Sequence, residues 1–549
     1  MVGSHRSSPP QEDEHRVIAQ LKRLLFGTRE SASQNAALLA AGTLTSRLTG
    51  LVRLIVLAVV LGVRPLADAY NLGNNTPNML YDLLLGGVIS ATLLPVLSAR
   101  FSVAGRRLGT KSQATILTLG IVGLLVATMI FELLAPAIIG LYTIANHHAY
   151  ALAQRELATE LLRLFAPQLF FYGAISLFTA VLNLRGNFAS AAFAPIANNI
   201  VSVASLVTFA ALYPGANLSI VLAHPDAVLI LGLGSTAGVA AQMLVLLPVM
   251  LRLGIEFRPS FALRDPAVRE MFSLSSWTIG FVIANQIAVF VVQAIADPRP
   301  GFISAYNYAY LFFQLPYAIV SLSIMTALQP RLARLWATSD RQGFAANLTR
   351  ALRASVAITL PLAAVMLVGA PVGLDLVLRY GAVGMAGVNL TAAALQGFAV
   401  GLPGFALFLS IVQGLQATRN ARVVFVLYLV ENGLNIVLAF ALVNRYGIVG
   451  LTTSLSIAYT VAALLGLFVL MRMHALRAPG EVVRVWLRLA MIGAVAALVL
   501  WRTLPSIAAP RSVGFFLQTL GALLICAGVF VVLNALATRL GRQGREIHR

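Results

Sequence analysis

Arg47 and Arg53 lie inside a long apolar run at residues 34–62. A charged side chain at the centre of a membrane helix costs about 2.5–3.5 kcal/mol on insertion scales, so each one needs a partner or a function. The planar guanidinium group of arginine suits phosphate and pyrophosphate, which it binds through two parallel hydrogen bonds. We therefore expect Arg47 and Arg53 to hold an anion inside a water-filled cavity. The alternative is a structural ion pair buried between helices.

The next apolar run, at 68–99, contains two acidic residues, Asp68 and Asp82. If the first run is a helix that begins at the cytoplasmic side near Gln34, Arg47 lies about 20 Å along its axis. On the returning helix Asp82 lies about 21 Å from Asp68. Both charges are then near mid-membrane, where Arg47 and Asp82 can pair. For Asp82 a direct role in binding and a structural role are equal alternatives.

Three further polar side chains are candidates for the same cavity. Arg53 should lie level with Asn74 and Asn75, whose amides could share its anion. Arg163 lies just before Pro167, in the first turns of the fourth apolar run. It can either face the cavity or extend its charged end to the membrane surface, because long basic side chains do both.

A different chemistry is possible in the eleventh apolar run, which contains Glu431, Asn432 and Asn435. Residues four apart share one face of a helix, so Glu431 and Asn435 could form a coupling site for H⁺ or Na⁺. The alternative is a cluster of hydrogen bonds between helices.

The composition identifies the class of protein that must position these groups. Hydrophobic residues make up 59% of the 549-residue chain and charged residues only 11%. Soluble domains are about one-quarter charged, and a helix needs about 20 apolar residues to cross a bilayer. We predict an all-α, polytopic membrane protein with about fourteen transmembrane helices, near 34–62, 68–99, 113–141, 158–183, 188–213, 227–251, 270–296, 303–329, 351–378, 387–415, 423–444, 447–471, 485–504 and 513–537.

The net charge of +20 is explained by membrane topology rather than by a nucleic-acid-binding surface. Most arginines fall in alternate connections, near 100–111, 252–269, 331–350, 419–422 and 477–484 and in the tail from 539. Cytoplasmic loops are enriched in arginine and lysine, so both termini are expected in the cytoplasm. We expect no nucleic-acid partner. The single cysteine, Cys526, excludes an intramolecular disulfide.

The chain is expected to form one membrane domain with an internal repeat. Pro95 and Pro330, in similar L-x-P-x-L contexts, are 235 residues apart, and Arg185 and Arg419 are 234 apart. Such repeats are common in alternating-access transporters, with the site at the repeat interface. We predict a cytoplasmic arm (1–33), a six-helix N-lobe (34–254), a pseudo-symmetric six-helix C-lobe (255–474), two additional helices (475–538) and a cytoplasmic tail (539–549).

Signatures of soluble enzymes are missing from the sequence. It contains no GxxxxGK[ST] loop, no HExxH and no CxxC. An ATP-driven pump is therefore disfavoured. We expect a transporter rather than an enzyme, with no metal site and no cofactor other than a possible coupling ion.

Several motifs resemble the MviN/MurJ family of lipid II flippases, within the multidrug/oligosaccharidyl-lipid/polysaccharide exporter superfamily. Residues 46–53 match the family's S-R-x-x-G-x-x-R, and A-D-A-Y at 67–70 is similar to T-D-A-F. P-N-M-L at 77–80 and L-P-V-L at 94–97 resemble P-N-L-L and V-P-x-L, and R-Y-G at 379–381 matches x-Y-G. The resemblance extends over nearly the whole chain from residue 34.

This resemblance implies two six-helix lobes in a V and two final helices that form a groove for a lipid tail. It implies outward flipping of an undecaprenyl-pyrophosphate-linked peptidoglycan precursor in the bacterial inner membrane, driven by an ion or the membrane potential. Membrane lipids and cell-wall synthesis proteins are the implied partners. By position, Arg47, Arg53 and Asp68 match residues of the family's central cavity, and Arg163 matches its basic residue in the fourth span.

Two departures point to a divergent branch. Tyr81-Asp82 replaces the family's Arg-Arg, and A-Y-L-F-F-Q-L-P at 309–316 replaces A-D-R-x-x-E-x-P. Arg47 and Arg53 would then hold the anion with help from Asn74, Asn75 and Gln314. The arginine-rich, lysine-poor usage is typical of a high-GC actinobacterium.

Three other functions compete with lipid II flipping. The first is flipping of another polyprenyl-linked glycan, which the missing arginines favour. The second is cation-coupled drug export, for which carboxylates and aromatic residues would suit the substrate better than arginines. The third is a non-transporting scaffold for cell-wall synthases.

Overall fold

The computed structural model describes residues 32–82, 105–253, 259–262, 276–476, 479–505 and 513–547. Every regular element in these ranges is a helix. In a bilayer no water satisfies the backbone, and a helix satisfies its own N–H and C=O groups, so long apolar runs fold as helices. The prediction of an all-α polytopic protein is confirmed.

The first bundle is formed by helices before residue 253. They are α2 (Ala32–Leu61), α3 (Pro65–Asp82), α5 (Gly105–Tyr142), α6 (Ala151–Phe165), α7 (Pro167–Leu184), α8 (Phe188–Leu212), α9 (Leu218–Ala223) and α10 (Pro225–Arg252). α8 packs against both α2 and α10, and α3 packs against α6. α6 and α7 together make one span, which is interrupted at Pro167 because proline has no N–H to continue the helical hydrogen bonds.

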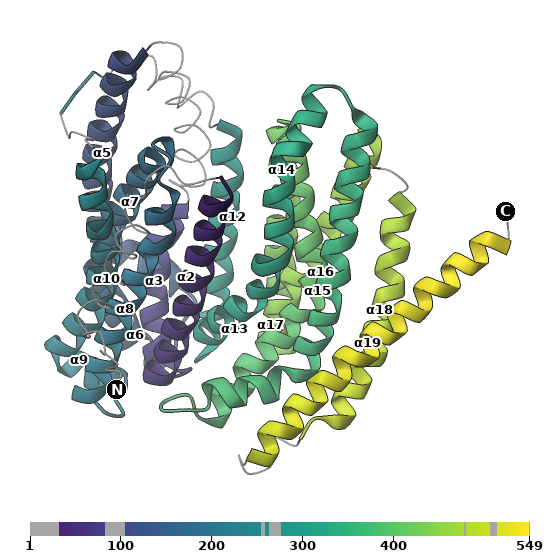
Figure 1. Cartoon of the computed structure of the whole chain (residues 1–549). Coiled ribbons are helices and arrows are strands. Elements are labelled where there is room, and N and C mark those ends of the chain that lie inside the picture. Colours follow the sequence, from purple (N-terminus) through teal and green to yellow (C-terminus); the bar gives the residue numbers. More distant parts are fainter. Residues whose placement is uncertain are drawn as a thin grey trace, which may run out of the picture.

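The second bundle follows, as Figure 1 shows in teal and green. It contains α12 (Ser276–Ala296), α13 (Phe302–Pro316), the π-helical turn η2 (Tyr317–Ser321), α14 (Leu322–Ala337), α15 (Arg341–Leu378), α16 (Gly384–Ala417) and α17 (Ala421–Arg472). α16 packs against α15, α17 and α13 and forms the centre of this bundle. The last helices are α18 (Pro479–Thr503), which packs against α15, and α19 (Val513–Ile547), which packs against α18.

α17 contains two spans rather than one. Gly447, at φ 56° and ψ −135°, reverses the chain direction inside its range. The halves then fold against each other, since Ser454 Oγ donates a 2.9 Å hydrogen bond to Asn435 Oδ1. The predicted spans at 423–444 and 447–471 are therefore confirmed. Counting α17 twice and adding α3 and the shorter α12 to the other long apolar helices gives fourteen among the described residues, the predicted number. Residues 83–99 of the predicted span at 68–99 lie outside the described residues.

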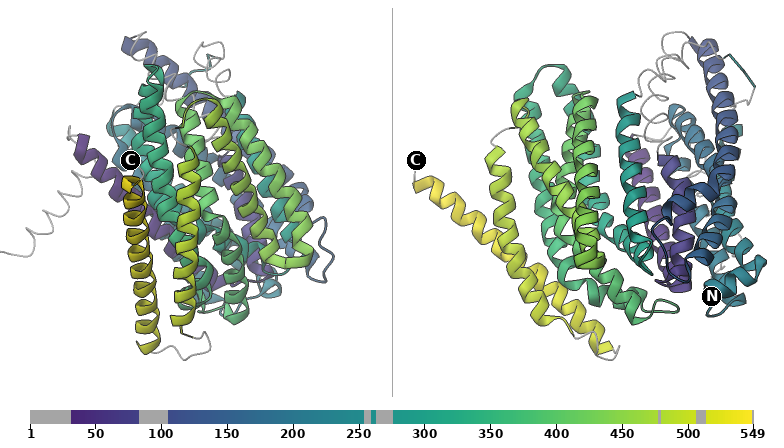
Figure 2. Two further views of the ribbon diagram at one scale, coloured as in Figure 1. Left: turned by 90° about the vertical axis from the view of Figure 1, so that its right-hand side faces the viewer. Right: turned by 180° about the vertical axis from the view of Figure 1, so that it is seen from behind.

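The two bundles meet at one end, which we call the clasped end (59–68, 297–304 and 379–384). The amide of Ala382 donates a 2.7 Å hydrogen bond to the carbonyl oxygen of Val59, across the two bundles. Gly381 has φ 54°, and a Cβ there would lie 2.4 Å from the same oxygen. Only glycine fits such a backbone approach. Figure 2 shows the α15–α16 connection reaching the first bundle at this end.

Candidate functional site

A polar cavity of about 670 Å³ lies between the bundles. Its walls come from α2, α3 and α8 on one side and α13 on the other. Its polar lining residues are Thr43, Ser46, Arg47, Arg53, Asn71, Asn74, Asn75, Asn78, Asn199, Asn307, Tyr310 and Gln314. A second cavity, of about 590 Å³, adjoins it, because Arg47, Tyr310 and Gln314 line both. We call them the amide-lined cavity and the ring-lined cavity.

The two predicted arginines come together in the amide-lined cavity. Arg47 is exposed and lines both cavities, and Arg53 is half-buried. Nη1 of Arg53 donates a 3.3 Å hydrogen bond to Oδ1 of Asn198 on α8. The same oxygen accepts from Ser202 Oγ at 3.1 Å, and Asn198 Nδ2 donates to Gln242 at 3.3 Å. These contacts orient the Arg53 guanidinium, because Asn198 is itself held from two sides.

No acidic residue appears among the described residues that line either cavity. Arg47 and Arg53 are the charged groups there, and the remaining polar lining is mostly amide. Guanidinium and amide N–H groups are hydrogen-bond donors, and charge-assisted hydrogen bonds to an anion are about twice as strong as neutral ones. The arrangement can therefore hold a phosphate-like anion in a partly dehydrated space.

The amides of Asn74, Asn75 and Gln314 line the amide-lined cavity, as the sequence led us to expect. Sequence reasoning missed Asn199 and Asn307. Asn199 donates to Thr49 Oγ1 at 2.9 Å, while Nδ2 of Asn307 is buried without a hydrogen-bond partner among the described residues. The adjacent pair Asn198-Asn199 inside an apolar run was the signal that would have found the first of these.

Asp68 lies outside this lining. Its side chain is 1% exposed, and Oδ1 accepts hydrogen bonds from the amide (2.9 Å) and the hydroxyl (2.6 Å) of Ser304. Oδ2 accepts from the amide of Gly301 at 2.5 Å. Asp68 of α3 thus caps the N-terminus of α13 in the other bundle, where backbone N–H groups and the helix dipole favour a carboxylate. This position favours a role in closing the clasped end.

The other two charged candidates, Asp82 and Arg163, are not among the described residues that line the cavities between the bundles. α3 ends at Asp82, but the side chain of Asp82 lies outside the described residues, and so does its predicted pairing with Arg47. Arg163 is exposed near the end of α6 and lines none of the cavities between the bundles.

A second buried carboxylate, at the clasped end, accepts hydrogen bonds from the opposite bundle. Asp297, in the turn after α12, is 1% exposed and accepts hydrogen bonds from Asn146 Nδ2 (3.0 Å) and Gln154 Nε2 (2.7 Å) of the first bundle. Burial raises the pKa of Asp297 to about 6, and the two amide hydrogen bonds oppose that shift only in part. The sequence reasoning did not single out this residue.

Glu431, on α17, is 1% exposed, and neither of its carboxylate oxygens has a hydrogen-bond partner among the described residues. Tyr306, Tyr428 and Tyr459 lie within range of its charge. Asn435 bonds instead to Ser454, and Asn432 donates to the Tyr428 carbonyl in its own helix at 2.8 Å. Glu431 is thus separate from the two amides, and its coupling role stays a prediction.

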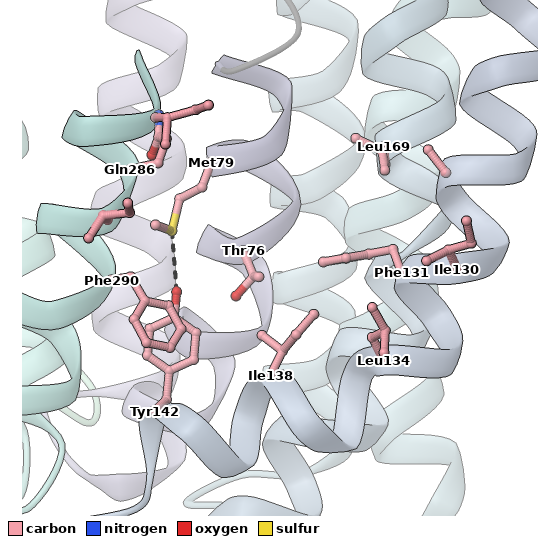
Figure 3. A pocket seen from close by; sticks show the side chains of 13 residues that line it. Thr76, Met79, Ile130, Phe131, Leu134, Ile138, Tyr142, Leu169, Gln286 and Phe290 are labelled. Atoms are coloured by element: carbon pink, nitrogen blue, oxygen red, sulfur yellow. Dashed lines mark hydrogen bonds between the residues drawn. The ribbon is translucent and has the colours of Figure 1, made fainter. Parts of the chain in front are cut away.

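A third cavity, of about 600 Å³, is almost wholly apolar. It lies between α3, α5 and α7 of the first bundle and α12 of the second. Figure 3 shows Tyr142 and Phe290 side by side at one end, with the Tyr142 hydroxyl donating to Met79 Sδ at 3.2 Å. Gln286 lines both this cavity and the ring-lined cavity, so α12 forms the wall between them.

Solved structures share this fold. A lipid II flippase MurJ in an inward closed conformation aligns with a TM-score of 0.74, covering 92% of this chain and 99% of that one at 19% identity. An inward-facing multidrug resistance transporter of the MATE family aligns with a TM-score of 0.64 at 15% identity, covering 79% of this chain and 98% of that one. These similarities show a MurJ- and MATE-like fold.

Sequence comparison gives the family. A probable lipid II flippase MurJ of Vibrio cholerae is 27% identical over 487 residues, 85% of this chain and 89% of that protein. The lipid II flippase MurJ of Burkholderia cenocepacia is 26% identical over 505 residues, 89% of this chain and 87% of that protein. The family profile described as lipid II flippase MurJ matches residues 57–521, beginning just after Arg53. The chain therefore belongs to the MurJ lipid II flippases, a family of multi-pass membrane transporters.

Proposed function

We propose that this protein flips lipid II, the undecaprenyl-pyrophosphate-linked peptidoglycan precursor, from the cytoplasmic to the outer leaflet of the bacterial inner membrane. Arg47 and Arg53 hold the pyrophosphate. The observation that carries this proposal is the cavity between the bundles, whose described lining contains those two arginines and no acidic group. An anionic headgroup entering such a space exchanges water for preorganised donors.

The movement in this proposal is alternating access. In this proposal the clasped end faces the periplasm, which the arginine-rich alternate connections support, because such connections are typical of the cytoplasmic side. With Asp68 and Asp297 bridging the bundles there, the cavity loads from the cytoplasmic side. Release outside requires both carboxylates to give up their partners in the opposite bundle.

The lipid tail stays in the membrane while the headgroup moves. We assign residues 475–538, which contain α18 and most of α19, to a groove for this tail. Their exposed side chains are largely apolar and include Met491, Leu498 and Leu524 at 68%, 57% and 65% exposure. α18 also packs directly against α15, so a tail on its surface would lie beside the second bundle.

Glu431 is the proposed site of ion coupling. A buried carboxylate without a partner is costly as an anion, so it favours either a bound proton or a bound cation such as Na⁺. Loading of this group in one state and release in the other would link the ion gradient to the movement of the bundles. Asn432 and Asn435 would support the helix face rather than bind the ion, since both are engaged with protein groups.

Another polyprenyl-linked glycan is the second candidate substrate. The cavity face of α13 presents Tyr310, Leu311 and Gln314 in place of charged residues. A substrate with a different glycan next to the same pyrophosphate would suit this less charged wall.

The test is replacement of a depleted native lipid II flippase in a bacterial host. Growth and lipid II in the outer leaflet are measured for wild type, Arg47→Ala, Arg53→Ala and the control Arg163→Ala at matched membrane levels. We expect rescue by wild type and Arg163→Ala and loss of rescue with both cavity variants. Rescue by all four would discard the arginine site. Correct insertion of wild type without rescue would reject lipid II and favour the other glycan.

A further inference from the structure

An arginine lies between the last two helices. Arg488 falls five positions after Val483 in the apolar span of α18, and its side chain is half-buried. Nη2 donates a 3.3 Å hydrogen bond to Oδ1 of Asn534, near the end of the apolar span of α19. An arginine at such a depth commonly extends its charged end to the membrane surface. Arg488 instead reaches sideways, so its guanidinium group is held between α18 and α19.

The charge of Arg488 is not compensated by the described residues. The Asn534 amide is neutral, and Nε of Arg488 is buried without a hydrogen-bond partner among them. Residues 475–538 contain five arginines and one acidic residue, Glu481, whose side chain lies outside the described residues. A guanidinium group has five N–H donors, and an ionised side chain inside a membrane span by default marks a functional site. The partner that this site favours is an anion.

Two more arginines lie near Arg488. Arg484 is exposed one turn earlier on the same face of α18. On α15, the half-buried Arg353 lies seven residues before Leu360, which is about two turns and therefore the same face. That face packs against α18, because a Cβ at Gly493 would lie 2.8 Å from Leu360 Cδ2.

The arginines of α15 and α18 are also at the same depth. The two helices run in the same direction, since the approach of Gly369 to Leu500 follows the Leu360 contact along both helices. Arg353 and Arg488 then differ in depth by only about 3 Å, at 1.5 Å per residue. We call this set the groove arginines: Arg353, Arg484 and Arg488.

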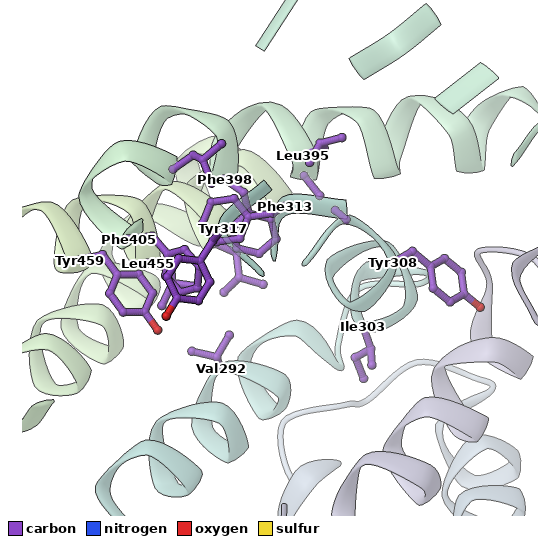
Figure 4. Close-up of a cluster of buried hydrophobic side chains, with 14 of the residues drawn as sticks. Val292, Ile303, Tyr308, Phe313, Tyr317, Leu395, Phe398, Phe405, Leu455 and Tyr459 are labelled. Atoms are coloured by element: carbon purple, nitrogen blue, oxygen red, sulfur yellow. The ribbon is translucent and has the colours of Figure 1, made fainter. Parts of the chain in front are cut away.

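The groove arginines lie across the second bundle from the amide-lined cavity. α13 lines that cavity, α16 packs against α13, α15 against α16, and α18 against α15. Figure 4 shows packed rings within this series, where Phe313 of α13 stacks on Phe398 of α16 at 5.2 Å. Figure 2 shows α18 and α19 on the side of the second bundle away from the first. This site is therefore separate from Arg47 and Arg53.

We propose that the groove arginines bind the pyrophosphate of the lipid substrate while its chain lies along α18 and α19. This inference rests on the proposed function and adds a docking site that the substrate occupies before its headgroup enters the cavity. Three guanidinium groups match the multiple charges of a pyrophosphate better than the single charge of a bilayer phosphodiester. The apolar side chains of Leu487 and Met491, at 60% and 68% exposure, continue the site into the hydrocarbon.

The test uses undecaprenyl pyrophosphate with a diazirine in the isoprene unit next to the pyrophosphate. The full-length protein is placed in phosphatidylcholine nanodiscs with this lipid and irradiated, and the labelled peptides are mapped. We expect labelling of residues 475–538 to fall about tenfold in Arg488→Gln, whose amide can still bond to Asn534 but carries no charge. Arg488→Lys keeps the charge and should stay within about threefold of wild type. The matched control is Arg502→Gln, at the other end of α18, which should label like wild type.

The outcomes separate this inference from the proposed function. No labelling of wild type anywhere in the chain would overturn both. Labelling of α2 and α13 alone would leave the proposed function standing and reject the docking site. Equal labelling of 475–538 in wild type and Arg488→Gln would make Arg488 a structural link to α19. If Arg488→Gln does not insert, the exposed Arg484→Gln replaces it, with an expected loss of about threefold and the same reading of an unchanged result.

Two further lipids identify what the site recognises. Phosphatidylglycerol, added at the mole fraction of the labelled lipid, should leave the labelling of 475–538 unchanged. A fall to the level of Arg488→Gln would assign the site to bilayer phospholipids and overturn its assignment to the substrate. Diazirine-labelled undecaprenol, which has no phosphate, should label wild type and Arg488→Gln equally. A loss of its labelling in the variant would show that the substitution disturbs the groove itself and would reject the phosphate contact.

Discussion

Gln154 of α6 donates a hydrogen bond of 2.7 Å to Oδ1 of Asp297, across the two bundles and 143 positions along the chain. Asn146 donates to the other carboxylate oxygen, and Tyr150 and Asp68 are the titratable groups whose charges lie within range. The carboxylate is almost fully buried, yet it belongs to a turn and not to a span. It is therefore a group whose protonation can be set from one side of the membrane.

Closure of the clasped end should strengthen as the pH falls from about 8 to 5. Burial raises the pKa of Asp297 to about 6, so the closed state binds a proton more tightly than a hydrated open state does. The closed state therefore loses stability as the pH rises through about 6. Spin labels at exposed Leu152 and Tyr446, in a Cys526→Ser background, would report the distance between the bundles.

Asp297→Asn is the matched variant for this measurement. Its side chain has the same shape but does not titrate, so the label distance should depend less on pH in this range than it does in wild type, with Asp68 as the remaining buried carboxylate at the clasped end. A pH response of unchanged size in Asp297→Asn would assign the effect to another group.

Removal of the Asp68 carboxylate should open the clasped end rather than weaken substrate binding in the amide-lined cavity directly. Asp68→Asn places an amide donor against the donors of Gly301 and Ser304, so we expect a destabilisation on the order of 1–3 kcal/mol. The thermal midpoint should fall and the distance between the labels should increase. Weaker lipid binding at an unchanged label distance would instead favour the direct role in substrate binding.

Gly381→Ala should destabilise the clasped end through the backbone. The new Cβ would meet the Val59 carbonyl oxygen at 2.4 Å, and alanine is strained at φ 54°. Gly433→Ala is the control, because nothing lies within 4 Å of a Cβ there and the residue is inside α17. We expect the thermal midpoint to fall for the first variant and to stay constant or rise for the second. Equal midpoints would contradict the tight approach.

Asn198→Ala should weaken the anion site without removing a charge. Arg53 loses the acceptor that orients it, so lipid II affinity should fall about threefold to tenfold. In Arg53→Ala the same substitution should have little further effect, because the two residues act as a unit. A double-mutant cycle tests this: lipid II binding is measured for Asn198→Ala, for Arg53→Ala and for the double variant. Additive losses would show that Asn198 acts independently.

The sequence could predict the class of fold, the fourteen spans and the two arginines of the cavity. Each of these depends on local chemistry: apolar length forces helices in a bilayer, and a charge inside such a helix needs a polar environment. Arg47 and Arg53 are six residues apart on one helix, about 9 Å along its axis, so both fall inside the same membrane span.

Only the tertiary structure decided what the acidic residues contact. Asp68 reaches Ser304, 236 positions away, and Asp297 reaches Gln154 in the other bundle, while Glu431 reaches no partner among the described residues. These contacts depend on the rotation of each helix about its axis and on the side on which the bundles meet. Helix packing sets both, and no local pattern along the chain encodes them.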